Sequence, residues 1–412
     1  MANPKIRPQQ LRVGLYVQLD IPWMKHPFLT NAFKIRSEAQ VRSLRRLGLK
    51  EITFDPQRSD TTPLPLDTPK ETPDHGPERE DPLWREKRAR IERLKRRRVQ
   101  LNRCSKHYQE SLCSVRKTMD LLFAEPATAV RAADQVVGDL IEELSAEEGA
   151  ALQLVNMKAS NENVWFHVVN VAVLSLLLGR HLGLDESSLH LLGMGALLHD
   201  LGHAFIPDTL LLKPEPLTPP EEAVYRRHPQ LGHSQAARLG ILPREVLEIV
   251  LQHHEHLDGS GWPQGLQGPA IAPLARLLGL VNRYENLCNH PRFGLSPYEA
   301  VARLYARERA WFDPGMLNVF IANLGIYPPG TLISLSDGRL GAVITVNPAD
   351  RLHPQVMVYD PDIPSTEAPI LDLAEEGLDI ANTCKRSAVS TEVLAYLNLG
   401  EQIAYYLDGS AP

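Results

Sequence analysis

The amino-acid sequence predicts a mainly α protein, with a central all-helical domain, a small α/β or α+β domain before it and a small β-rich appendage after it. Three observations support this fold class. Residues 106–323 show helical apolar spacing almost throughout, broken by proline and glycine turns. Residues 1–55 combine strand-like alternation with one helical pattern. Residues 324–412 contain β-rich runs separated by turn residues.

The first domain is expected to span residues 1–55. "LRVGLYVQL" alternates apolar and polar side chains as a strand does, "SEAQVRSLRRLGL" has helical apolar spacing, and "KEITFD" is typical of a second strand. Its charged residues show no convergent pattern. We therefore expect a regulatory or dimerisation module without catalytic residues.

Residues 56–82 are rich in proline and polar side chains and predict a flexible linker. A basic and helical connector is expected over residues 83–150, starting with "WREKRARIERLKRRRVQ". Such a segment could bind nucleic acid or an acidic membrane surface. However, Glu86 and Glu92 interrupt it, and no aromatic side chains are interleaved for base stacking. We expect a solvated helix and no nucleic-acid polymer as partner.

The β-rich appendage is expected over residues 324–412. In "PPGTLISLSDGRLGAVITVN" two β-rich runs flank Asp337 and Gly338, which is a hairpin signal. "PQVMVYDP" supplies a third candidate strand, and a short helical segment follows near residues 390–400.

Composition narrows the class of protein further. The chain has 412 residues, a formal net charge of -6, 43% hydrophobic and 23% charged residues, which fits a globular protein with room for two or three domains. No apolar stretch approaches the roughly 18 residues of a membrane span, and the first ten residues contain no apolar export segment. We expect a cytoplasmic protein without membrane insertion.

Histidines are concentrated in the central domain, on helix faces that are otherwise apolar. His167 lies on the apolar face of "NVWFHVVNVAVLSLLLG". His199 lies on that of "LHLLGMGALLHDLGHAF", with Asp200 beside it and His203 one turn later. A single histidine in such a place is more often a satisfied core residue than a metal ligand.

Three further histidines change that balance. The apolar face of "PREVLEIVLQHHEH" leads to His253 and His254, and His228 lies between the two helices in "RRHPQLG". Adjacent ionisable side chains near apolar helix ends are costly to bury unless they are paired or bind a cation. Imidazoles and a carboxylate suit Mn, Fe, Zn or Ni, and several of them together could hold two ions. The pattern therefore predicts a metal site.

These motifs resemble a known family. The order of His167, "HD" at 199–200, "HP" at 228 and "HHEHLDGSGWP" from 253 is similar to the HD-GYP subfamily of HD-domain metal-dependent phosphohydrolases, the bacterial cyclic di-GMP phosphodiesterases. The resemblance covers about residues 150–310, and the HD-type domain is expected over 151–323. "LRVGLYVQLDIPWMKHPF" resembles the N-terminal domain of unassigned function that often precedes it. "YPPGTLISLSDGRLGAVITVN" resembles the β segment that follows it.

The resemblance implies a reaction and a set of site residues. Cyclic di-GMP would be hydrolysed to pGpG or GMP by a metal-bridging hydroxide, with His199, Asp200 and His203 as catalytic residues. Two divalent transition metals, Fe or Mn, would be the cofactors. Their ligands would be His167, His199, Asp200, His228, His253, His254 and the side chain at the position of Asn282. Substrate would contact His203, Gly259, Gly261, Trp262 and Arg292, with the two glycines allowing close approach.

The sequence departs from the family pattern at several positions. Trp262 replaces the tyrosine of the GYP motif, which keeps an aromatic face and loses the hydroxyl. Asn282 stands where the family has a metal-ligating aspartate, and a neutral amide binds a hard cation less well. His203 replaces a lysine that is associated with the substrate phosphate, and it is cationic only if its pKa is not depressed. Asn163 replaces a glutamate found in three-metal members, so two metals are expected.

Alternatives stay open at this stage. Arg292 is a candidate phosphate ligand at a shifted spacing, or an exposed loop arginine. Asn282 and His203 favour a catalytically weak or inactive HD-GYP-like receptor of cyclic dinucleotides, or a protein-interaction module. A phosphohydrolase of another nucleotide would share the motifs, because fold does not fix substrate. We expect the active enzyme, with cyclic di-GMP, a second copy of the chain in a homodimer and a protein of cyclic di-GMP signalling as partners.

Overall fold

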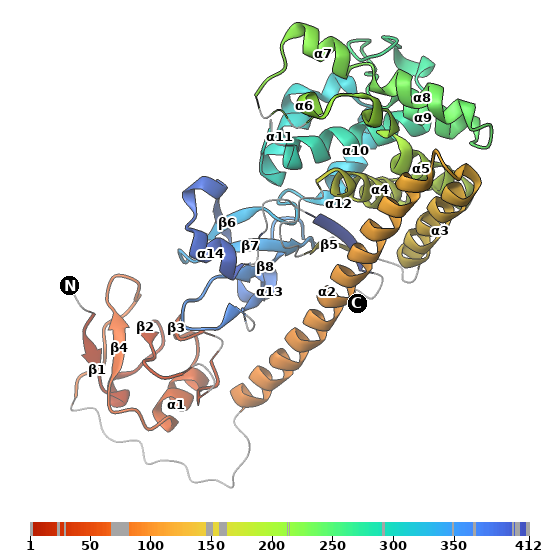
Figure 1. Ribbon diagram of the computed structural model, residues 1–412. Helices are drawn as coiled ribbons and strands as arrows, with labels where there is room; N and C mark the ends of the chain where they lie inside the picture. The colour runs from red at the N-terminus through yellow and green to blue at the C-terminus, as the bar shows by residue number, and fades with distance from the viewer. Residues whose placement is uncertain are drawn as a thin grey trace. The chain divides into compact units, whose positions relative to one another are not determined.

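The structure is a computed structural model. It describes residues 3–22, 25–28, 30–66, 82–145, 151–155, 163–211, 213, 215–290, 293–347, 350–365, 368–397, 399 and 404–408. The chain divides into two compact units, Met1–Arg98 with Asp360–Pro369, and Val99–Tyr359 with Ile370–Pro412. Helices dominate and the sheets are small, so the predicted mainly α class is confirmed (Figure 1).

The first unit contains a four-stranded antiparallel sheet in the order β1-β4-β2-β3. Its elements are β1 (Lys5–Ile6), β2 (Tyr16–Gln18), β3 (Ala32–Lys34), α1 (Glu38–Arg46) and β4 (Ile52–Asp55). Helix α1 begins at Ser37, whose side chain accepts a hydrogen bond from the Gln40 N–H. The predicted helix and both predicted strands are present, and Val17, Leu44 and Ile52 form part of one buried core.

Several segments in and around this unit bear on the predicted boundaries. Leu64 N–H donates to Gln10 O at 2.9 Å, so residues just past 55 still bond to the first domain. Residues 67–81, most of the predicted linker, lie outside the described residues. The predicted connector helix is present as α2 (Pro82–Leu121), which begins in the first unit and ends in the second.

The second unit is built from helices that pack around α4 and α10. Helix α4 packs against α5 and α10, and α9 packs against α5, α8 and α10. Val171, Leu192, Ile249 and Leu278 are fully buried in this core. After α2, the helices are α3 (Pro126–Ser145), α4 (Asn163–His181), α5 (Glu186–Leu198), α6 (Asp208–Leu211), α7 (Pro219–Tyr225), α8 (His228–Arg238), α9 (Arg244–Gln252), α10 (Pro273–Asn289), α11 (Pro297–Arg307) and α12 (Pro314–Leu324).

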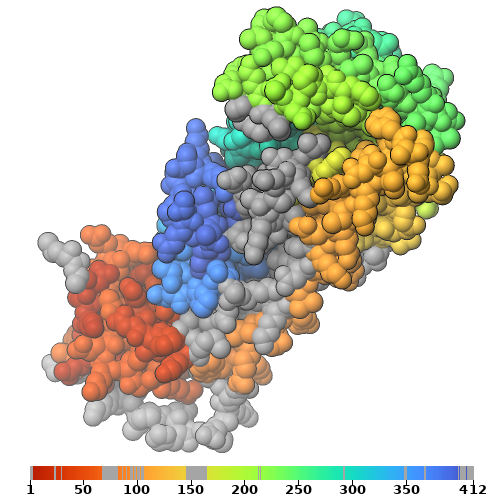
Figure 2. Space-filling model, viewed as in Figure 1, coloured from red at the N-terminus to blue at the C-terminus, as the bar shows by residue number. Residues whose placement is uncertain are grey.

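Local sequence signals explain where many of these helices begin. Helices α7, α10, α11 and α12 start with a proline, whose fixed φ suits the first turn and whose missing N–H would have no helical partner there. Ser296 and Glu299 form a capping box at α11. In the space-filling view the green segments form one continuous surface (Figure 2).

The C-terminal region contains the predicted hairpin. The strands form a five-stranded antiparallel sheet in the order β10-β6-β7-β8-β9, with Gly338 at φ +87° in the turn between β6 and β7. The predicted third strand is β8. The bounds are β6 (Leu332–Leu335), β7 (Leu340–Thr345), β8 (Gln355–Val358), β9 (Ile370–Asp372), α13 (Leu373–Glu376), β10 (Ile380–Thr383) and α14 (Thr391–Tyr396).

A two-stranded sheet joins the end of the chain to the helical core. β11 (Ala404–Asp408) pairs antiparallel with β5 (Ala151–Val155), a strand that the helical pattern did not predict. Tyr405 of β11 is fully buried in the helical core. Part of the C-terminal region therefore belongs physically to the helical domain.

Among the described residues, we find no helix with the length and apolar character that a bilayer span requires.

Candidate metal centre

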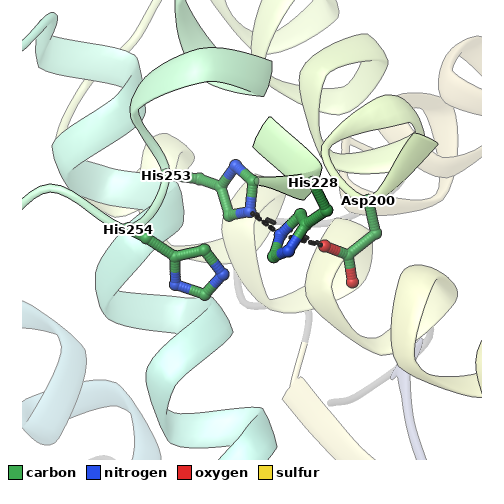
Figure 3. A group of neighbouring side chains, drawn as sticks. All are labelled: Asp200, His228, His253 and His254. Atoms are coloured by element: carbon green, nitrogen blue, oxygen red, sulfur yellow. Dashed lines mark hydrogen bonds and ion pairs between the residues drawn. The ribbon is translucent and has the colours of Figure 1, made fainter. Parts of the chain in front are cut away.

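Separate elements bring the predicted ligands together. His167 lies on α4, His199 is the C-cap residue that follows α5, and Asp200 is the N-cap residue of the 3-10 turn Leu201–Phe205. His228 is the first residue of α8, and His253 ends α9 with His254 next to it. In Figure 3 the carboxylate of Asp200 and the ring of His228 point toward the ring of His253, and His254 lies beside them.

The backbone fixes how three of the imidazoles are oriented. His199 Nδ1 donates to Ala196 O at 2.7 Å, and His253 Nδ1 donates to Val250 O at 2.9 Å. His228 Nδ1 donates to Tyr225 O at 3.0 Å. A carbonyl oxygen can only accept, so each Nδ1 carries the proton and each neutral ring keeps its Nε2 lone pair free. Those Nε2 atoms face the interior of the centre.

Asp200 lies between two pairs of histidines. His167 Nε2 and His199 Nε2 are 3.2 Å apart, and Asp200 Oδ2 lies 3.5 Å and 3.3 Å from them. His228 Nε2 and His253 Nε2 are also 3.2 Å apart, and Asp200 Oδ1 lies 3.3 Å and 3.6 Å from them. One carboxylate oxygen therefore faces each pair, as a bridging ligand would.

The donor atoms fit metal binding. Two groups have ligand atoms that all lie within 4.8 Å of one another, namely His167, His199 and Asp200, and Asp200, His228, His253 and His254. Asp200 Oδ1 is buried and has no hydrogen-bond partner among the described residues. The lone pairs of His228 Nε2 and His253 Nε2 face each other at 3.2 Å and repel unless a cation lies between them. Imidazole nitrogen and carboxylate oxygen suit Mn, Fe and Zn.

The electrostatics prepare Asp200, His253 and His254 for a cation, while His167 must release a proton before it can bind one. Burial lowers the pKa of His253 to about 4 and holds the pKa of His254 well below its usual value, so both rings are neutral at pH 7. Burial would raise the pKa of Asp200, but the neighbouring histidines, among them the hydrogen bond from protonated His167, outweigh it and hold that pKa well below its usual value. Burial would likewise lower the pKa of His167, yet Glu285 and Asp200 raise it to about 10.

His203 lies at the edge of the cluster, outside both ligand groups. Its Nδ1 is 3.4 Å from Asp200 Oδ2, and its ring centroid is 4.2 Å from that of His228. Burial holds the pKa of His203 well below 6.5, so the ring is neutral and does not reproduce the charge of a lysine. Its Nε2 is buried without a hydrogen-bond partner among the described residues.

Asn282 is buried on α10, at 2% exposure. Its Oδ1 accepts from Asn286 Nδ2 at 2.6 Å. Along the same helix, a Cβ on Gly279 would lie 2.9 Å from His253 O, and Glu285 contacts His167. Residues 279, 282 and 285 are spaced one turn apart, so Asn282 lies on the helix face that packs against the predicted ligands.

The loop that follows His254 is held together by hydrogen bonds between Glu255 and the loop backbone. Glu255 accepts from Gln264 N–H at 2.6 Å and from Leu266 N–H at 2.9 Å. A Cβ on Gly261 would lie 2.5 Å from the Glu255 Cα. Glycine at position 261 therefore allows the loop backbone to pass close to the backbone of Glu255. Gly259 has φ +81°.

Trp262 covers one of the predicted ligands. It stacks on His254 with ring centroids 4.0 Å apart and an interplanar angle of 19°. The backbone N–H of Trp262 donates to His254 O at 3.1 Å. Arg292 and the side chain of Asn163 lie outside the described residues.

The sequence patterns missed the groups that support the ligands. Glu285 Oε2 accepts from His167 Nδ1, and Glu285 is buried at 2% exposure. A carboxylate on the outer nitrogen of a ligating histidine fixes its ring and raises its basicity. The available signal was a glutamate one turn after Asn282 on the apolar face of α10.

The comparisons with known proteins agree with this arrangement. A family model described as "Domain of unknown function (DUF3391)" matches residues 4–133, and one described as "HD domain" matches residues 143–316. Fold and ligand cluster define an HD-domain protein. The chain belongs to the HD-GYP type of HD-domain proteins, with a DUF3391 domain in front, and the predicted family is confirmed.

Particular relatives show how far this similarity extends. The cyclic di-GMP phosphodiesterase PA4108 of Pseudomonas aeruginosa is 32% identical over 367 residues, covering 85% of this chain and 83% of the relative. The cyclic di-GMP phosphodiesterase response regulator RpfG of Xanthomonas campestris is 35% identical over 159 residues, covering 35% of this chain and 39% of RpfG. The solved structure of Bd1817, an HDG"Y"P protein from Bdellovibrio bacteriovorus, has 20% identity and a TM-score of 0.45, covering 77% and 97% of the two chains.

Proposed function

We propose that this protein is a metal-dependent cyclic di-GMP phosphodiesterase that hydrolyses the cyclic dinucleotide to pGpG or GMP. The observation that carries the proposal is the position of Asp200, with one oxygen toward each of two histidine pairs. Relatives that include PA4108, which is similar over most of its length, are named for this activity. The ligand groups support two divalent ions, Fe or Mn, that share Asp200.

The residues of this chain would divide the work as follows. His167, His199, Asp200, His228, His253 and His254 would hold the ions, which supply an activated water and neutralise phosphoryl charge when bound. In its neutral ring, the partnerless Nε2 of His203 would donate a hydrogen bond to the substrate phosphate in one tautomer, or accept a proton in transfer in the other. Trp262 would contact the nucleotide with its aromatic face, and the turn of Gly259 and Gly261 would shape that side of the site. Arg292 stays a candidate phosphate ligand.

A product assay tests the proposal. Purified protein loaded with Mn or Fe is incubated with cyclic di-GMP, and the products are separated by chromatography beside a His199→Ala control. Appearance of pGpG or GMP in the wild type alone supports the enzyme. Absence of product from protein with full metal occupancy contradicts it.

One observation favours a second function, a cyclic-dinucleotide receptor or interaction module with weak or absent catalysis. Asn282 is neutral, and its Oδ1 is engaged by Asn286, so this position offers less to a cation than an aspartate does. Binding of cyclic di-GMP without turnover, measured by calorimetry on metal-loaded protein, would support this alternative.

Other expectations stay predictions. They are the homodimer, a protein partner in cyclic di-GMP signalling, the cytoplasmic location, and the domain boundaries at 1–55, 56–82, 83–150, 151–323 and 324–412. Size-exclusion chromatography with light scattering tests the dimer, and limited proteolysis tests the boundaries.

A further inference from the structure

A buried chain of hydrogen bonds lies behind the predicted ligand His167. Its Nδ1 donates to Glu285 Oε2, and Glu285 Oε1 accepts from Asn170 Nδ2 at 3.0 Å. Asn170 lies one turn after His167 on α4 and is fully buried. Glu285 therefore fixes the His167 ring, and Asn170 fixes the carboxylate of Glu285 from the same helix.

The amide oxygen of Asn170 faces α2 and β11, which carry none of the predicted metal ligands. Its Oδ1 accepts from the hydroxyl of Tyr108 on α2 at 3.0 Å and from the N–H of Tyr405 on β11 at 3.2 Å. A backbone N–H can only donate, so the oxygen of the amide must face β11 and the NH₂ group must face Glu285. Both tyrosines are fully buried.

We propose that Asn170 is a positioning residue of the metal centre, through which β11 and α2 hold His167 by way of Glu285. The inference rests on the proposed metal-dependent function and goes beyond it, because it makes the C-terminal strand part of the support of the metal site. Asn170 and Tyr405 are 235 positions apart in the sequence. The bond from the backbone N–H of Tyr405 to Asn170 is then a condition for full metal affinity.

A purely structural role makes a different prediction. If Asn170 only satisfies the N–H of Tyr405 and the hydroxyl of Tyr108, its loss lowers the thermal midpoint and leaves metal affinity unchanged. If it acts through Glu285, its loss weakens metal binding, and that effect disappears once Glu285 is gone.

The test is a double-mutant cycle on the full-length chain, with Mn²⁺ affinity measured by competition with a chromogenic chelator. Asn170→Ala and Glu285→Ala are each expected to weaken Mn²⁺ binding by about 10- to 100-fold. The double variant is expected to be no weaker than Glu285→Ala alone. An unchanged affinity in Asn170→Ala, or effects that multiply in the double variant, would overturn the proposal.

Two tyrosine variants keep the proposal testable even if Asn170→Ala fails to fold. Tyr108→Phe removes only the hydroxyl that bonds to Asn170, and a loss of Mn²⁺ affinity of about two- to tenfold is expected. Tyr284→Phe is the matched control, because it removes a buried hydroxyl that bonds to Tyr405 Oη at 3.0 Å and leaves the bond from the Tyr405 backbone N–H to Asn170 in place. A lower thermal midpoint with unchanged Mn²⁺ affinity is expected for the control.

Equal losses of affinity in the two tyrosine variants would show general loosening of the core and overturn the proposal, as would an unchanged affinity in Tyr108→Phe. The readout needs neither substrate nor turnover. If these variants lose Mn²⁺ affinity as expected but the wild-type protein does not hydrolyse cyclic di-GMP, only the proposed function is overturned.

Discussion

The Nε2 atoms of His228 and His253 face each other at 3.2 Å, while the Nδ1 of each ring donates to a backbone carbonyl in the turn before it. Neither ring can place a proton between them without giving up that bond or becoming cationic. Burial lowers the pKa of His253 to about 4, which disfavours the cationic form. The arrangement is stable when a cation other than a proton occupies the space between the rings.

Replacing the shared carboxylate should therefore empty the site. Asp200→Asn keeps the shape of the side chain and removes its charge and one acceptor oxygen. Metal content, measured by mass spectrometry of the purified protein, should fall from near two ions to below one per chain, and hydrolysis should be lost. Wild-type metal content in this variant would mean that Asp200 is not a bridging ligand. Asp208→Asn, in a short exposed helix outside the cluster, is the matched control and should keep its metal.

Restoring a carboxylate on α10 should strengthen binding. Asn282→Asp adds a negative charge on the helix face that packs against His253 and His167, and Mn²⁺ affinity should rise by about tenfold. Asn286→Asp adds the same charge one turn later and should give a smaller gain. If both variants bind Mn²⁺ as the wild type does in chelator competition, Asn282 does not face the cluster.

The loop after His254 should tolerate a methyl group at one glycine and not at another. In Gly261→Ala the new Cβ would lie 2.3 Å from the His256 N and 2.5 Å from the Glu255 Cα, so the backbone must move. Gly268→Ala has no atom within 4 Å of its Cβ and meets only the strain of φ +49°, about 1 kcal/mol. We expect loss of metal for Gly261→Ala alone, and a larger drop in melting temperature for it than for Gly268→Ala. Equal melting temperatures would contradict the close approach.

The first domain should weaken in mild acid because of His26. Its Nε2–H donates to Asn31 Oδ1 at 2.8 Å and its Nδ1 accepts from the Phe28 N–H at 3.3 Å, so a second proton on the ring would break a bond. Burial, with the nearby charge of Lys87, lowers the pKa of His26 to about 4 despite the bond to Asn31. The unfolded chain takes up a proton near pH 6.5 and the folded chain does not, so stability is full above that pH and falls between about 6.5 and 4.

Hydrogen exchange measures this effect locally. Protection factors of peptides that cover β2 and β4 should fall as the pH is lowered from 7.5 to 5. In His26→Gln, which cannot titrate, the same peptides should show a flatter pH dependence. A parallel fall in both proteins would assign the acid sensitivity to other groups.

The sequence predicted His167, His199, His253 and His254 because they lie on apolar helix faces or at their ends, which is a local pattern. His228 was predicted from its place between those helices and from the family resemblance. It could not predict the support of those ligands. The bond between His167 and Glu285 joins positions 118 apart, and that between Asn170 and Glu285 joins positions 115 apart. A buried amide such as Asn170 carries no periodic signal, and its partners are known only when the helices are packed.

The strand pair at the end of the chain was missed for a similar reason. β5 lies between α3 and α4, β11 follows the five-stranded sheet, and the two pair only in the folded protein. Each is only five residues long, and β5 directly precedes a helix-rich region. The hairpin of β6 and β7 was predicted because its turn residues and both strands lie within one short segment.

The most direct test of the account is a metal titration of activity. Metal-free protein, prepared with a chelator, receives Mn²⁺ in steps while hydrolysis of cyclic di-GMP is followed by chromatography. A metal-dependent phosphodiesterase with two ions should show no hydrolysis without metal and a rate that rises until about two equivalents are bound. Undiminished hydrolysis by the metal-free protein would contradict the central claim, and so would full metal occupancy with no product.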